Sequence, residues 1–131
     1  MSKQYNIIRP AGLKPMPDKF EEMVAEICAL YFKSDVAFVL RGNHTTPDLK
    51  VLKTGQFWEI KNIKGNSKHT IEDNLRKADK QSKNVVISLL RASKADARRT
   101  KTRIEYMLSH TKVKFDGVIL ITKAEEVIDI K

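Results

Sequence analysis

The sequence contains little of several residue types that mark particular classes of protein. Its single cysteine, Cys28, excludes an intrachain disulfide bond and a cysteine-rich metal site. No stretch approaches the roughly twenty apolar residues of a membrane-spanning helix, and the start of the chain has no apolar run like that of a signal peptide. We therefore expect a soluble protein that acts in a cytoplasm and has no membrane partner.

Aromatic and acidic residues are also scarce. Aromatic residues make up 7% of the chain, and the candidates for stacking on nucleobases are Trp58, Tyr106 and Phe115, the first expected in the core. Lys and Arg number 25 against 16 Asp and Glu, which gives a net charge of +9 and a pI near 9.7. Such an excess favours a partner rich in phosphate, chiefly nucleic acid.

The positive charge is concentrated between Lys61 and Lys114. That stretch carries fifteen Lys and Arg against five Asp and Glu, so its balance of +10 accounts for the whole net charge. A solvated helix face would explain any one basic run, but a bias over half of the chain favours a surface that follows a phosphate backbone. The candidate nucleic-acid-binding residues are Lys64, Lys68, Arg76, Lys77, Lys80, Arg98, Arg99, Lys101 and Arg103.

The 131 residues suit one domain, which we place at residues 17–131 after an irregular arm at residues 1–16. Apolar spacing and capping residues predict helices over 18–33, about 67–82 and 93–110. Strands are expected at 36–40, 49–52, 56–63, 85–89, 118–121 and 127–130. The predicted fold is α/β (α+β), in the order α-β-β-β-α-β-α-β-β, with a mixed central sheet flanked by helices.

The most informative motif joins Asp48, after Pro47, to Glu59-Ile60-Lys61. Alternate side chains of a strand share a face, so Glu59 and Lys61 point the same way, with Asp48 on the neighbouring strand. Two carboxylates can hold a divalent metal such as Mg²⁺ or Mn²⁺, and an ammonium can stabilise the negative charge that develops on a phosphodiester. This pattern favours a nuclease, although a turn residue at Asp48 and a surface ion pair of Glu59 with Lys61 would give the same residue pattern.

Other residues are candidates for supporting or alternative roles. Glu22 on the first helix would supply a further acid, and Gln81 after the second helix would contact the site or cap that helix. His69 or His44 would act as general base or acid beside Thr70 and Lys61, and drive attack of an RNA 2′-hydroxyl without metal. Both mechanisms stay open, as does a non-catalytic protein that only binds nucleic acid.

Helix, three strands, helix and strand, in that order, match the αβββαβ core of the PD-(D/E)xK nuclease fold. Three segments, Thr46-Pro47-Asp48, Phe57–Lys61 and Ile71–Ile87, together resemble the C-terminal tRNase domain of contact-dependent growth inhibition (CdiA-type) toxins and their prophage and mobile-element relatives. The likeness covers residues 20–130 and implies a toxin nuclease that cleaves RNA, often tRNA, inside a target bacterium. An immunity protein is then a possible partner.

The resemblance leaves mechanism and context open. Related toxin domains include metal-independent RNases of the barnase–EndoU–colicin–RelE type, so it does not choose between the two mechanisms. Toxin domains of this family normally end a very large secreted protein, whereas this chain is short and begins with Met1. We therefore expect either a free-standing prophage or mobile-element protein, or a piece of a larger toxin. RNA against DNA, the cut position and the oligomeric state stay undetermined.

Overall fold

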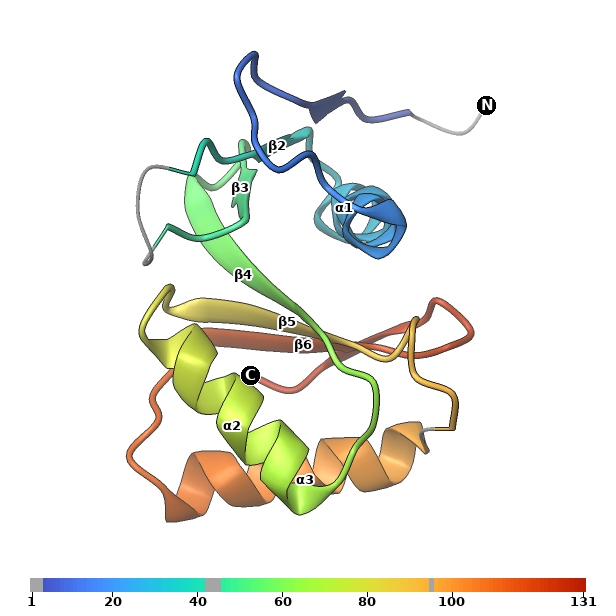
Figure 1. Ribbon diagram of the computed structural model, residues 1–131, viewed down its shortest axis with the longest axis vertical. Helices are drawn as coiled ribbons and strands as arrows, with labels where there is room; N and C mark the ends of the chain where they lie inside the picture. Colours follow the sequence, from blue (N-terminus) through green and yellow to red (C-terminus); the bar gives the residue numbers. More distant parts are fainter. Residues whose placement is uncertain (1–3, 42–45, 95) are drawn as a thin grey trace.

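In the residues that the computed structural model describes, 4–41, 46–94 and 96–131, seven strands form one mixed sheet in the order of the sequence (Figure 1). The strands are β1 (Ile7–Ile8), β2 (Val36–Phe38), β3 (Leu49–Val51), β4 (Gln56–Asn62), β5 (Asn84–Ser88), β6 (Gly117–Ile121) and β7 (Val127–Asp129). The helices are α1 (Lys19–Phe32), α2 (Lys68–Asp79) and α3 (Ala97–His110). The predicted α+β class and mixed sheet are confirmed.

The helices cover both faces of the sheet. Every residue of β5 is buried, and successive side chains pack on opposite faces of the sheet: Val86 lies in the core beneath α1, whereas Val85 and Ile87 lie in a second core beneath α2 and α3. In Figure 1, α1 accordingly lies on one side of the sheet, and α2 and α3 lie on the other. Cys28 of α1 is buried in the first core, and burial raises the pKa of its thiol to about 12, as expected for an unreactive cysteine.

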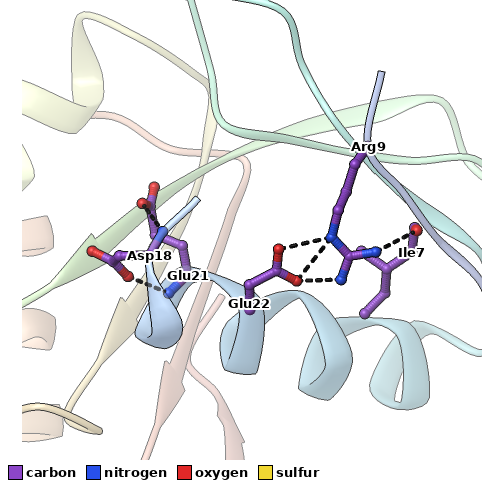
Figure 2. Close-up of polar contacts among 5 residues, drawn as sticks. All are labelled: Ile7, Arg9, Asp18, Glu21 and Glu22. Atoms are coloured by element: carbon purple, nitrogen blue, oxygen red, sulfur yellow. Dashed lines mark hydrogen bonds and ion pairs between the residues drawn. The ribbon is translucent and has the colours of Figure 1, made fainter. Parts of the chain in front are cut away.

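Side chains that accept hydrogen bonds fix where the helices begin. Asp18 and Glu21 form a reciprocal capping box at the start of α1, which Figure 2 shows and the sequence predicts. Ser67 caps α2 by accepting from the backbone N–H of Thr70. The third helix begins at Ala97 rather than at the predicted Ser93, because Asp96 accepts hydrogen bonds from the first backbone N–H groups.

The N-terminal segment is more regular than the sequence predicts. Ile7 and Ile8 pair in parallel with β2, and Leu13 is buried in the core beneath α1. Arg9 also binds the carboxylate of Glu22, which ties the segment to α1 (Figure 2). A two-residue strand carries no periodic signal, so only the tertiary pairing reveals it. Among the described helices, none has the length and apolar character that would let it cross a bilayer.

Strand β4 changes partners in the middle, and this change creates the edge on which polar side chains gather. Gln56 to Trp58 pair antiparallel with β3, whereas Glu59 to Asn62 pair parallel with β5. The second half of β4 therefore has a neighbouring strand in register on one side only. Figure 1 shows β4 as the long diagonal strand that connects the two halves of the molecule.

Candidate active site

Asp48 takes the place that a neighbouring strand would occupy beside β4. Leu49 of β3 is opposite Trp58, so Asp48, one residue earlier, faces Glu59, one residue later. The backbone N–H of Asp48 donates to the carbonyl of Trp58 at 3.2 Å. Beyond that point β3 no longer pairs with β4, and the N–H of Ile60 donates instead to Oδ2 of Asp48 at 2.9 Å. One carboxylate oxygen thus anchors Asp48, and the other remains for the site.

Glu59 and Lys61 share one face of β4, as the alternation predicts. Nζ of Lys61 lies 3.2 Å from Oε2 of Glu59, and both side chains are largely shielded, with exposed fractions of 18% and 4%. Trp58 and Ile60 point to the opposite face and lie in the core beneath α1. The carboxylates of Asp48 and Glu59 and the ammonium of Lys61 therefore converge at one place.

These three side chains line a pocket of about 410 Å³. Two further charged residues, Glu21 and Arg41, also line this pocket, and the sequence did not single them out for the site. Nη2 of Arg41 lies 3.2 Å from Oε2 of Glu21 and 3.5 Å from Oδ1 of Asp48. The full lining comprises Glu21, Arg41, Thr46, Asp48, Glu59, Ile60, Lys61 and Gln81.

The helix acid in this pocket is Glu21, not Glu22. Successive helix residues project about 100° apart, and Figure 2 shows the two carboxylates on different sides of α1, with Glu22 turned to Arg9. Glu21 serves two purposes, because Oε1 caps the helix and Oε2 faces Arg41. The capping box was visible in the sequence, but the direction of the helix relative to β4 was not.

Burial controls the protonation of the site. Burial and, next, the adjacent Asp48 together raise the pKa of Glu59 to about 8, although Lys61 opposes the rise. Burial also raises the pKa of Glu21. In the described part of the chain no donor contacts Oε1 of Glu59, which is fully buried beside the Asp48 carboxyl. A buried carboxyl oxygen that faces a second carboxyl group and has no donor favours a proton or a cation between the two groups.

This donor set fits a small divalent cation. Mg²⁺ and Mn²⁺ prefer carboxylate oxygens, and Mg²⁺ commonly binds through one or two carboxylates while water and phosphate oxygens complete its coordination. Asp48 and Glu59 supply two such groups, one with a buried oxygen that lacks a donor. Within the described residues, no group of three or more His, Cys, Asp and Glu side chains is arranged to hold a metal ion. Asp48 and Glu59 are therefore the candidate metal ligands of this structure.

Comparison with known proteins places the chain in a family. Residues 45–127 match the model of the contact-dependent growth inhibition CdiA C-terminal domain. The chain belongs to this family. Its fold is similar to that of a chain in the "CdiA-CT/CdiI toxin and immunity complex from Burkholderia pseudomallei", with a TM-score of 0.62 and 19% sequence identity over 96% of this chain and 98% of the other. No curated protein matches. Membership implies a toxic function of the nuclease type in general.

Not every predicted site residue of this CdiA C-terminal domain reaches the pocket. Gln81 lines it, whereas His69 and Thr70 lie in the first turn of α2. Gln81 follows the other end of that helix, whose twelve residues span about 18 Å. The structure therefore does not bring His69 and Thr70 to the lining. His44 lies outside the described residues.

The predicted nucleic-acid-binding residues of the domain fall into two groups. Arg76, Lys77 and Lys80 lie near the end of α2 that leads to Gln81, and Arg76 and Lys80 line a hollow shared with the end of α3. Lys64, Lys68, Arg98, Arg99, Lys101 and Arg103 lie near the opposite ends of both helices, where Asn66 Nδ2 donates to Thr100 Oγ1 at 3.0 Å.

Several of these basic side chains also have partners within the chain. Arg76 and Lys77 pair with acids one turn earlier at 2.5 and 3.0 Å, and Lys101 lies 4.0 Å from Glu105. Arg103 donates to the carbonyl of Asn66 and so holds the loop before α2. Arg103 therefore has a structural task in addition to the predicted one.

The exposed aromatic residues differ in part from those the sequence singles out. Trp58 is buried as expected, and Phe115 is buried as well, so neither can stack on a base. Tyr106 is 46% exposed and stacks on His110 with ring centroids 4.0 Å apart. Phe57, which is not among the predicted stacking residues, is 41% exposed on β4. Strand alternation places Phe57 on the face of Glu59, two residues later, but does not predict its exposure.

Proposed function

We propose that this CdiA C-terminal domain is a nuclease that hydrolyses phosphodiester bonds in RNA, with tRNA as the expected substrate. The observation that carries the proposal is the convergence of Asp48, Glu59 and Lys61 in one pocket at the edge of the sheet. Family membership supports the nuclease class. The excess of basic residues between Lys61 and Lys114 supports a polyanionic substrate.

Asp48 and Glu59 would hold Mg²⁺ or Mn²⁺, which when bound would polarise the phosphate and acidify a water molecule. Lys61, held beside Glu59 at 3.2 Å, would orient the attacking water or stabilise the negative charge of the pentavalent transition state. Water adds to phosphorus, the bond to the leaving oxygen breaks, and that oxygen takes up a proton. Arg41, between Glu21 and Asp48, fixes the positions of both carboxylates.

Partners of the domain follow from the same site. Arg76 and Lys80 lie next to Gln81 and would bind phosphates of the strand as it leaves the pocket. We also propose an immunity protein as a partner, and the similar solved structure is a complex of a toxin with an immunity protein. Such an immunity protein would inhibit cleavage by covering the pocket or the basic residues Arg76 and Lys80.

The test is incubation of the purified protein with tRNA and with plasmid DNA, with and without EDTA. Lys61→Met should lower the cleavage rate about 10²- to 10³-fold, by analogy with the loss of one transition-state donor. Lys53→Met is the matched control, because Lys53 is exposed in the turn of the same hairpin and should leave the rate unchanged. Asp48→Asn should abolish the cleavage that depends on a divalent metal.

Other results would contradict specific parts of the proposal. Cleavage that persists in EDTA and leaves a 2′,3′-cyclic phosphate would replace the two-carboxylate mechanism with the metal-independent one. Cleavage of DNA without cleavage of RNA would refute the proposed substrate. Salt-sensitive binding with no cleavage under any divalent metal would leave a protein that only binds nucleic acid.

A further inference from the structure

Phe57 is an apolar side chain kept at the surface beside the pocket. Its ring is 41% exposed, and it shares the face of β4 that carries Glu59 and Lys61. Its backbone is fixed on both sides, because Lys50 of β3 is its register partner and its carbonyl accepts from Ser82 Oγ and Asn84 Nδ2, each at 2.9 Å. The exposed ring is therefore held in place by a rigid part of the sheet.

Phe57 lines a hollow of about 330 Å³ that neighbours the pocket. Gln81 lines both, and Pro47, on the wall of the hollow, directly precedes Asp48. This volume is near the lower end of the roughly 300–1,000 Å³ of small-molecule sites, so it suits one small planar group. A group seated on Phe57 would lie directly beside whatever occupies the pocket.

Two lysines lie beside the ring and the hollow. Nζ of Lys50 lies over the Phe57 ring, 5.5 Å from its centroid, and Lys83 lines the wall of the hollow. This combination matches a nucleotide, because a base can stack on the ring in place of the Lys50 ammonium while the neighbouring phosphates meet the two ammonium groups. An apolar protein segment would use the ring but would leave the charge of Lys83 without a partner in the hollow.

We propose that Phe57 and this hollow bind one unstacked nucleobase of the substrate, adjacent to the phosphate that is cleaved. The inference rests on the proposed nuclease function and adds a substrate class to it. A base can reach Phe57 only if it leaves its helix, so the favoured substrates are single-stranded segments, loops and ends rather than continuous duplex. Stacking on an aromatic ring accepts any base, so Phe57 selects exposed bases rather than a sequence.

The experiment compares wild type, Phe57→Ala and Phe57→Trp on a single-stranded RNA that contains the mapped cut. One stacked base corresponds to about a 5- to 150-fold loss of kcat/KM in Phe57→Ala, whereas Phe57→Trp should stay close to wild type. Tyr31→Ala is the matched control, since it removes a similarly exposed aromatic ring (39%) from α1, outside the pocket and the hollow, and should change little. Thermal unfolding of each variant checks that the fold is intact.

A second set of substrates locates the base. Abasic nucleotides are placed in turn on each side of the cut, and one position should reduce wild-type cleavage by the same factor as Phe57→Ala without reducing the variant further. Equal losses in wild type and variant at every position would overturn the proposal, as would wild-type rates for Phe57→Ala.

Failure of the nuclease function would be seen separately, as absence of cleavage by wild type. In that case fluorescence anisotropy with the same oligonucleotides decides the question. Weaker binding of Phe57→Ala to intact but not to abasic RNA supports the subsite, and equal affinities refute it.

Discussion

Replacement of Glu59 by glutamine tests the electrostatics of the pocket, because it preserves the shape of the side chain but removes a buried carboxyl group that titrates. In the wild type, burial and the neighbouring Asp48 raise the pKa of Glu59 from its ordinary 4.5 to about 8. The folded protein therefore binds this proton more tightly than the unfolded chain. The resulting stabilisation is fully present below about pH 4.5 and is lost as the pH rises through about 8.

The size of this effect follows from the two pKa values. Each pKa unit corresponds to about 1.36 kcal/mol, so the rise from 4.5 to about 8 sets an upper bound of roughly 5 kcal/mol for the wild-type loss. Because the charged groups of Asp48 and Lys61 lie beside Glu59 and interact with it, we expect a loss of roughly 3 to 5 kcal/mol between pH 4.5 and 9. Glu59→Gln has no carboxyl group at this position and does not suffer this loss. Its free energy of unfolding should therefore rise relative to that of the wild type by the same roughly 3 to 5 kcal/mol as the pH rises.

The assay is urea unfolding of both proteins at intervals from pH 5 to 9. The contact with Lys61 also differs between the two proteins, so the change of their difference with pH, rather than its absolute value, is the quantity to compare. Glu105→Gln serves as a control, because it makes the same substitution at an exposed position of α3. A constant difference between wild type and Glu59→Gln across the range would refute the reasoning.

Two further predictions concern single contacts. Glu21→Ala should lose the reciprocal cap, which lowers the free energy of unfolding by about 0.5–2 kcal/mol, and should also lose activity. Glu21→Gln should keep the cap and lose activity alone. Urea unfolding and cleavage assays separate these effects, and an active Glu21→Gln would exclude the carboxylate from the site. Gly117→Ala should destabilise the fold by about 1–3 kcal/mol, because its Cβ would lie 2.7 Å from Oδ1 of Asn84 and 2.8 Å from Cη2 of Trp58. Unchanged thermal unfolding of that variant would contradict the tight packing.

Most of the fold could be predicted from local patterns. The capping box and apolar spacing located α1 to within a residue at each end, and continuous apolar runs located β5 and β6. The pattern did not find β1, because two isoleucines carry no periodicity and their pairing with β2 joins residues distant in the sequence. It also extended the third helix back to Ser93, where the competing signal was the Asp96 cap.

The sequence by itself determined the spacing that puts Glu59 and Lys61 on one face of a strand, with Asp48 one strand away, because strand alternation is a local property of the backbone. Tertiary structure decided what surrounds that motif. The direction of α1 across β4 brings Glu21 rather than Glu22 to the pocket, and burial raises the pKa of Glu59. The exposure of Phe57 likewise depends on which strands flank β4. Such properties arise from residues distant in sequence, and no local pattern encodes them.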